Sequence, residues 1–107
     1  MEEIPGLRAT LVGKSDLPGP GGATWTEWME AELPAGSWRD RLAIRGEVPD
    51  GELLDAYRRA DLFVAPSRFE SFGLIYVEAM AHGLPVVALA QGSAPEVIPQ
   101  GCGLLVE

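Results

Sequence analysis

The sequence contains few residues that bind metals or form disulfides. Its 107 residues include one cysteine, Cys102, and one histidine, His82. A single cysteine cannot form an intramolecular disulfide, and these two residues cannot make a multi-cysteine or paired-histidine metal site.

Positive charge is also scarce. Lys14 is the only lysine, and 8 basic residues stand against 16 acidic residues, for a formal net charge of −8. Nucleic-acid binding through phosphates requires clustered lysine and arginine, and so does electrostatic anchoring to anionic membranes. The composition therefore argues against both kinds of partner.

Long hydrophobic runs are missing as well. A membrane-spanning helix needs about 20 predominantly apolar residues, and no stretch of the sequence approaches that length. The N-terminus, Met1-Glu2-Glu3, is acidic where a secretory signal peptide would be basic. We therefore expect a cytoplasmic protein without a membrane span. The sequence leaves open whether a longer parent protein associates peripherally with the inner membrane.

The residues that are abundant predict a small α/β domain. Apolar residues make up 47% of the chain, and 13 glycines and 9 prolines divide it into short segments. At this length one hydrophobic core is expected, so residues 1–107 are interpreted as one partial domain. We expect strands at 7–12, 41–45, 62–65, 85–90 and 103–106, alternating with helices at 24–33, 50–60 and 73–82 and a helical turn at 93–98.

This alternation is typical of a doubly wound, mostly parallel, Rossmann-like sheet. The continuous apolar runs at 62–65 and 85–90 predict strands that are buried on both faces. The chain stops directly after the last predicted strand, so we expect the sheet to be incomplete, with an edge that another segment must cover.

A candidate anion site lies where a loop enters the helix at 73–82. Ser71, Phe72, Gly73 and Leu74 would present free backbone N–H groups at the positive end of the helix dipole. Gly73 would let a ligand approach the backbone closely, as phosphate sites require. The pattern lacks the lysine and the glycine run of a Walker loop, so by itself it is weakly specific.

Glu78 interrupts an otherwise apolar helix. It shares one helical stripe with Leu74 and Ala81, and a carboxylate on a buried stripe is costly without hydrogen-bond donors. Two hydroxyls on adjacent carbons of a ligand, as on a ribose, would satisfy both carboxylate oxygens. An internal donor would do the same, and both alternatives are open at this stage.

Five other residues have simpler interpretations. Glu70, just before the candidate anion site, could contact a sugar hydroxyl or stabilise positive charge, although a solvated loop acid is the commoner case. His82 suits a surface position at the helix C-terminus. Ser93 and Glu96 have the spacing of a capping box. Cys102 is predicted to be a small buried residue.

The segment PSRFESFGLIYVEAMAHGLPVVA resembles the signature of the family 4 (group 1) glycosyltransferases, which have the GT-B fold. That signature contains two glutamates separated by seven residues, and Glu70 and Glu78 match them. GEVPDGELLDAYRRADLFVAPS and GSAPEVIPQGCGLLV resemble adjoining stretches of the same family. The resemblance covers nearly the whole chain and is weakest at residues 14–40.

The resemblance implies the nucleotide-sugar-binding, C-terminal half of a two-domain enzyme. Glu78 would hold the ribose hydroxyls, and Glu70 would contact the donor sugar. The diphosphate would lie against the backbone of Ser71, Phe72, Gly73 and Leu74. Gly46 to Val48 would border the nucleobase. Members of the family are metal-independent and retain the anomeric configuration, so no cofactor is expected and a nucleoside diphosphate sugar would be the substrate.

The sequence departs from the family pattern in three places. The "GR … KG" stretch that carries arginine and lysine is not present, Ser71 stands where glycine is commonest, and the N-terminal acceptor-binding domain is not encoded. The chain is therefore interpreted as a piece of an enzyme that is inactive alone. Its sheet edge would be covered by the missing domain or by another chain.

The leading hypothesis is the donor-binding part of a retaining glycosyltransferase. Three alternatives stay open: a nucleotide-sugar-binding module without catalysis, another GT-B class such as a nucleotide-sugar epimerase, and an inactive remnant.

Overall fold

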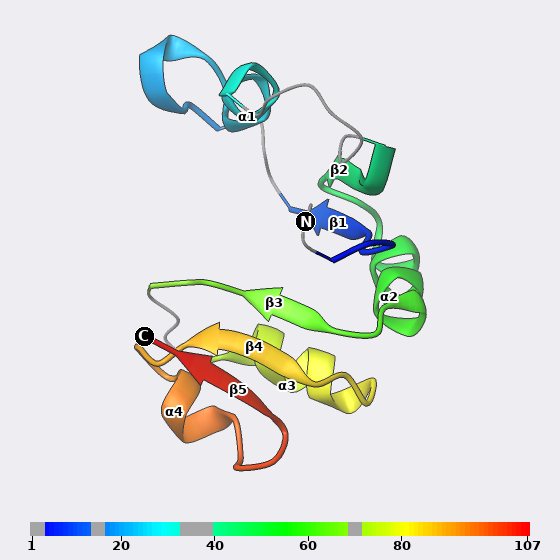
Figure 1. The fold of residues 1–107 in the computed structure, drawn as a ribbon, viewed down its shortest axis with the longest axis vertical. Coiled ribbons are helices and arrows are strands. Elements are labelled where there is room, and N and C mark those ends of the chain that lie inside the picture. The colour runs from blue at the N-terminus through cyan, green and yellow to red at the C-terminus, as the bar shows by residue number, and fades with distance from the viewer. Residues whose placement is uncertain (1–3, 14–16, 33–39, 69–71) are drawn as a thin grey trace. The chain divides into compact units, whose positions relative to one another are not determined.

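The computed structural model of the chain describes residues 4–13, 17–32, 40–68 and 72–107. Strands and helices alternate along the chain in the order that the sequence predicts (Figure 1). The elements are β1 (Ala9–Val12), η1 (Pro20–Gly22), α1 (Trp25–Glu32), β2 (Leu42–Gly46), α2 (Asp50–Arg59), β3 (Phe63–Ala65), α3 (Leu74–Ala81), β4 (Val86–Leu89), α4 (Ala94–Val97) and β5 (Gly103–Val106). No helix of the described part of the chain is long and apolar enough to cross a membrane.

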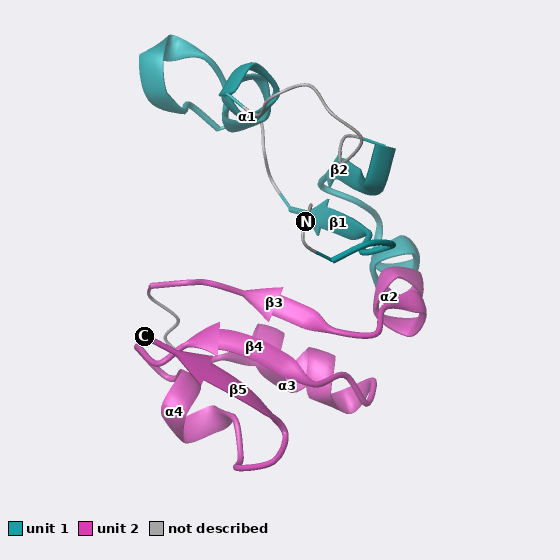
Figure 2. Cartoon of the chain, viewed as in Figure 1, with its two compact units in different colours: residues 1–53 teal, residues 54–107 magenta. Residues whose placement is uncertain are grey.

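The chain divides into two compact units, Met1–Leu53 (unit 1) and Leu54–Glu107 (unit 2), as Figure 2 shows. The boundary falls inside α2. The five strands form two sheets, β1-β2 and β3-β4-β5. Every strand pair in these sheets is parallel, as expected for a Rossmann-like fold.

Unit 1 contains a two-stranded sheet and helix α1. The strands β1 and β2 pair from Ala9↔Leu42 onward, and the register shifts between Leu11 and Val12. Thr24 begins α1: its hydroxyl accepts a hydrogen bond from the Glu27 amide at 3.2 Å and donates one to the Glu27 carboxylate at 3.0 Å. This contact satisfies one of the amides that a helix N-terminus leaves without an intrahelical partner.

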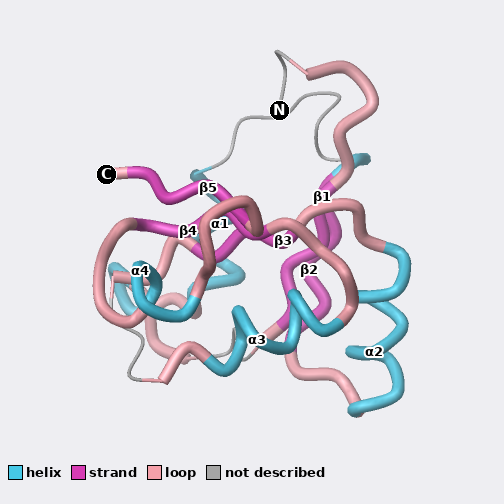
Figure 3. Tube along the Cα trace, turned by 90° about the horizontal axis from the view of Figure 1, so that it is seen from below, coloured by secondary structure: helices cyan, strands magenta, loops and turns pink. Residues whose placement is uncertain are grey.

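Unit 2 is built on the three-stranded sheet β3-β4-β5. Each crossover passes to the next strand in the same direction, through α3 and then through α4. Because parallel crossovers have one hand, both helices lie on the same face of this sheet. Figures 1 and 3 show α3 and α4 together on that side of the strands.

The core of unit 2 lies between this sheet face and the two helices. The buried hydrophobic residues of unit 2 come from α2, β3, α3, the turn after α3, β4 and the α4 region: Tyr57, Ala65, Tyr76, Ala79, Leu84, Val86, Ala88, Ala94 and Ile98. The opposite sheet face is open, with Val64 57% and Leu104 60% exposed. The prediction that residues 62–65 are buried on both faces is therefore wrong, because the helices of unit 2 cover one face only.

Strands β4 and β5 approach each other closely at one position. Gly103 pairs with Val86, and a Cβ at Gly103 would overlap the Val86 carbonyl oxygen. A side chain there would push the backbones apart, so the first residue of β5 must be glycine. This contact holds β5, and with it the C-terminal end of the chain, against the central strand.

Candidate functional site

Helix α3 begins at a left-handed glycine. Gly73 precedes the helix with φ 68° and ψ 30°, and no side chain of the described residues caps the amides that follow it. The first turn of α3 carries no acidic residue that could compete for these amides. The first N–H groups of a helix have no intrahelical acceptor, and the helix dipole adds about half a positive charge there. The N-terminus of α3 can therefore accept an anion.

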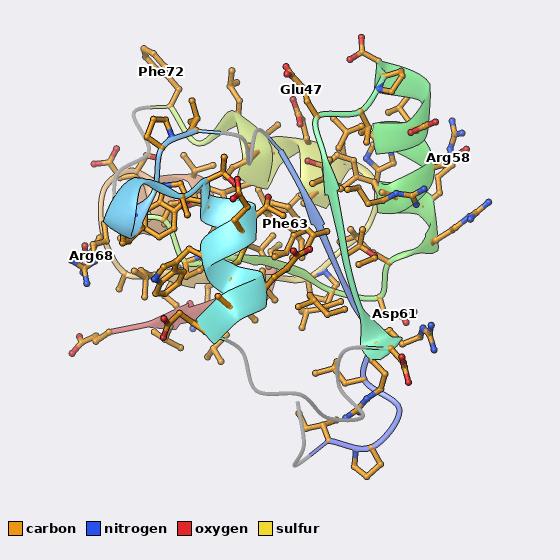
Figure 4. The ribbon with its side chains drawn as sticks, turned by 90° about the horizontal axis from the view of Figure 1, so that it is seen from above. Glu47, Arg58, Asp61, Phe63, Arg68 and Phe72 are labelled. Carbon is orange, nitrogen blue, oxygen red and sulfur yellow. The ribbon has the colours of Figure 1, made fainter. Side chains whose placement is uncertain are left out.

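The side chains on either side of Gly73 are exposed, whereas Gly73 itself is buried. Phe72 is 79% exposed, and Figure 4 shows its ring extending away from the ribbon. Leu74, the first residue of α3, is 65% exposed. The family resemblance implies that the diphosphate lies against the backbone of Phe72, Gly73 and Leu74. These three residues lead directly into α3. Ser71 and Glu70, which complete the predicted site, lie outside the described residues.

Gly73 is also in close contact with the loop that precedes α4. A Cβ at Gly73 would lie 3.0 Å from Ser93 Oγ, 3.0 Å from Tyr76 Cδ2 and 3.1 Å from Val97 Cγ2. The positive φ and the lack of space both require glycine at this position. The start of α3 is thus positioned by packing against the segment that follows β4.

Ser93 does not cap α4. Its backbone is in the right-handed helical region, with φ −82° and ψ −11°, and its side chain makes no capping hydrogen bond. The Glu96 amide instead donates to the Ser93 carbonyl oxygen at 3.0 Å. The predicted capping box is therefore wrong, because the Ser93 hydroxyl lies beside Gly73. This buried Oγ has no hydrogen-bond partner among the described residues.

Glu78 lies one turn after Leu74 on the same helix, and its side chain is exposed. The interpretation that it shares a buried stripe is wrong, because Leu74 and Ala81 are exposed too. An internal donor is nevertheless present: the Tyr57 hydroxyl donates a hydrogen bond to Glu78 Oε2 at 3.1 Å. The other oxygen, Oε1, makes no hydrogen bond to any residue that the structure describes.

Tyr57 holds its position through two ring contacts. The buried ring stacks on His82 at a centroid distance of 5.0 Å and an interplanar angle of 11°. It also meets the Phe63 ring at 5.9 Å and 40°. Burial raises the pKa of the Tyr57 hydroxyl to about 12, and the hydrogen bond to Glu78 and the charge of its carboxylate act in the same direction.

His82 ends α3 as its C-cap residue, which agrees with the predicted position at the helix C-terminus. Its Nδ1 lies 2.9 Å from the backbone carbonyl oxygen of Glu78, within hydrogen-bond distance. Glu78 therefore lies one turn before His82 at the C-terminal end of α3, and Tyr57 of α2 contacts both residues.

The two residues predicted to border a nucleobase belong to unit 1. Gly46 is the last residue of β2 and has a φ of 67°. Val48 follows it in the connection to α2 and is half-buried. They lie after the carboxyl end of a parallel strand, the position at which α/β sheets bind ligands. Gly73, Leu74 and Glu78 belong to unit 2.

A family model described as "Glycosyl transferases group 1" matches residues 2–107. The chain belongs to this family. Its parallel strands and alternating helices are consistent with a Rossmann-like half of the GT-B fold.

Curated glycosyltransferases resemble this group 1 chain along most of its length. It is 47% identical over 104 residues to the sulfoquinovosyl transferase SQD2 of Arabidopsis thaliana, which covers 94% of the chain and 17% of that protein. It is 38% identical over 106 residues to a D-inositol 3-phosphate glycosyltransferase of Mycobacteroides abscessus, which covers 98% of the chain and 23% of that protein. The chain thus spans about a fifth of the length of these relatives.

Sequence reasoning missed two contacts of this glycosyltransferase chain. The contact between Tyr57 and Glu78 was not predicted: a buried tyrosine hydroxyl requires a hydrogen-bond partner, but only the structure shows that the partner is the Glu78 carboxylate. The contact between Ser93 and Gly73 has no signal in the sequence. Cys102, predicted to be buried, is exposed, because it lies in the turn that leads from Pro99 into β5.

No group of three or more histidine, cysteine, aspartate or glutamate side chains in the described part of the chain could hold a metal ion.

Proposed function

We propose that this chain is the donor-binding part of a retaining glycosyltransferase that transfers a sugar from a nucleoside diphosphate sugar to an acceptor. One observation carries the proposal. Helix α3 combines uncapped amides at its start with a carboxylate one turn later, and one oxygen of that carboxylate has no hydrogen-bond partner among the described residues. A nucleoside diphosphate requires both features, because it joins an anionic diphosphate to a ribose with two adjacent hydroxyls.

The diphosphate would bind at the N-terminus of α3. The amides of Gly73 and Leu74 would donate hydrogen bonds to its oxygens, together with those of Ser71 and Phe72 in the preceding loop. Preorganised amides and the helix dipole would also stabilise the negative charge that develops on the leaving diphosphate. No metal ion is then required, and we propose that binding and transfer are metal-independent.

The ribose would bind at Glu78, whose carboxylate would accept hydrogen bonds from both hydroxyls. Glu70 would lie against the donor sugar and stabilise the positive charge that develops near the anomeric carbon. Gly46 and Val48 would border the nucleobase. This assignment uses the group 1 family membership, together with the positions of Gly46 at the end of β2 and of Glu78 on α3.

A calorimetric titration with UDP-, GDP- and ADP-sugars tests the assignment of Glu78. We expect one of these ligands to bind, with the same affinity in EDTA and in Mg²⁺. The Glu78→Ala variant should lose tenfold or more in affinity, because each hydrogen bond to a charged group contributes about 1.5–3 kcal/mol.

Asp61→Ala is the matched control for Glu78→Ala. Asp61 is also an exposed carboxylate of unit 2, but it lies before β3, at the amino end of that strand (Figure 4). This variant changes the net charge equally and should bind the donor normally. An affinity that is unchanged in Glu78→Ala would refute the ribose assignment, and a requirement for Mg²⁺ would refute metal-independent binding.

A further inference from the structure

We infer that Tyr57 is a positioning residue of the donor site, whose hydroxyl holds the Glu78 carboxylate in the orientation that accepts the two ribose hydroxyls. The inference rests on the proposed function, because it takes Glu78 as the ribose acceptor. It adds a residue of α2 to a site that the family signature places in the loop before α3 and on α3 itself.

The geometry gives Tyr57 the fixed position that such a role requires. Tyr57 is 8% exposed, and its ring contacts the rings of His82 and Phe63. Glu78, in contrast, is an exposed glutamate, and exposed glutamates lose considerable side-chain entropy when a ligand orders them. A hydrogen bond from a rigid donor orders the carboxylate before the ligand arrives, and preorganisation of this kind increases affinity.

The same helical turn anchors the positioning residue. His82 stacks on the Tyr57 ring, and its Nδ1 lies 2.9 Å from the Glu78 carbonyl oxygen. His82 Nδ1 therefore contacts the Glu78 backbone, the His82 ring stacks on Tyr57, and the Tyr57 hydroxyl donates to the Glu78 carboxylate. A shift of Tyr57 relative to α3 would disturb both the hydrogen bond to Glu78 and the stacking on His82.

The direction of the hydrogen bond is fixed. A carboxylate can only accept, so the phenol must donate, and it stays protonated because its pKa is raised to about 12. Each carboxylate oxygen has two lone pairs, and Tyr57 occupies one of the pairs on Oε2. The remaining pair on Oε2 and both pairs on Oε1 can accept two adjacent hydroxyls. Tyr57 thus supports a ribose at Glu78 without displacing it.

A double-mutant cycle on the 107-residue chain tests the inference. The four proteins are the wild type, Tyr57→Phe, Glu78→Ala and the double variant. The ligands are UDP, GDP and ADP, and then the 2′,3′-dideoxy form of whichever binds most tightly. Tyr57→Phe should weaken the ribonucleotide about three- to tenfold, which is the range of one ordinary hydrogen bond. It should leave the dideoxy nucleotide unchanged, and it should have no further effect in the Glu78→Ala background.

The outcomes separate the inference from the proposed function. An unchanged affinity in Glu78→Ala would refute the ribose assignment and the inference with it. A loss in Glu78→Ala with no loss in Tyr57→Phe would overturn the inference alone. An equal loss in Tyr57→Phe for the ribo and dideoxy ligands, or a loss that persists in the Glu78→Ala background, would show a general packing role and would also overturn it.

A second measurement does not depend on ligand binding or on the stability of Tyr57→Phe. With ¹³C-labelled tyrosine, the phenol titration of Tyr57 can be followed by NMR in the wild type and in Glu78→Gln. We expect a lower Tyr57 pKa in Glu78→Gln, since the negative charge near the hydroxyl is lost. Identical titrations in the two proteins would show that the contact is not formed in solution, and the inference would fail.

Discussion

At the scale of single residues, the proposed ribose site combines the charge of Glu78 with the rigidity of Tyr57. Glu78 supplies an exposed carboxylate, and Tyr57 supplies a buried donor 3.1 Å from one of its oxygens. A free carboxylate would be fully hydrated and mobile, so the ligand would have to order it. The contact with Tyr57 removes part of that cost in advance.

The raised pKa of Tyr57 predicts a specific dependence of stability on pH. The phenol titrates near 10 in an unfolded chain and at about 12 in the folded protein. Its contribution is therefore fully present below pH 10 and is lost as the pH rises from 10 to 12, because the unfolded state releases the proton first. Urea unfolding across this range should show a steeper loss of stability in the wild type than in Tyr57→Phe. Equal slopes would contradict the assigned environment of Tyr57.

The identity of Glu78 as a candidate could be predicted, and its partner could not. A lone carboxylate in an apolar helix, eight residues after Glu70, is visible in the sequence. The contact with Tyr57 joins positions 21 residues apart on two helices. It depends on how α2 packs against α3, and local sequence patterns do not encode that packing. For the same reason the sequence could not show that the Ser93 hydroxyl lies beside Gly73.

At the scale of elements, the proposed site depends on the conformation of the turn at which α3 begins. The helix ends were predictable because glycines flank them, and the helix predicted at 73–82 is observed as Leu74–Ala81. Its surroundings were less predictable. Apolar runs indicate strands, but whether one or both faces are covered depends on the order of the strands and the side taken by each crossover. Val64 was therefore predicted to be buried and is exposed.

Two glycines of unit 2 with left-handed backbone conformations provide a matched test of the packing at the start of α3. Gly73 and Gly83 have φ values of 68° and 76°, but a Cβ at Gly83 would meet nothing within 4 Å. A left-handed alanine costs about 1–3 kcal/mol, and Gly83→Ala should lose that amount of stability. Gly73→Ala should lose more, because its Cβ would also press on Ser93, Tyr76 and Val97. Equal losses in urea unfolding would show that the packing at Gly73 is loose.

At the scale of the whole molecule, the chain corresponds to about a fifth of the glycosyltransferases that it resembles. The order of its elements and its family were predictable from sequence, because apolar runs, glycines and the paired glutamates are local features. The division of the strands between two sheets was not, since strand pairing depends on contacts far apart in the chain. That these 107 residues alone do not transfer sugar stays a prediction.

The central claim is that the start of α3 and Glu78 together bind a nucleoside diphosphate. An NMR titration of the ¹⁵N-labelled chain with UDP, GDP and ADP tests it most directly, because each backbone amide reports its own environment. The account predicts that the largest shifts fall on residues 72–78, with the amides of Gly73 and Leu74 foremost. Shifts centred elsewhere in the chain, or none with any of the three nucleotides, would contradict it.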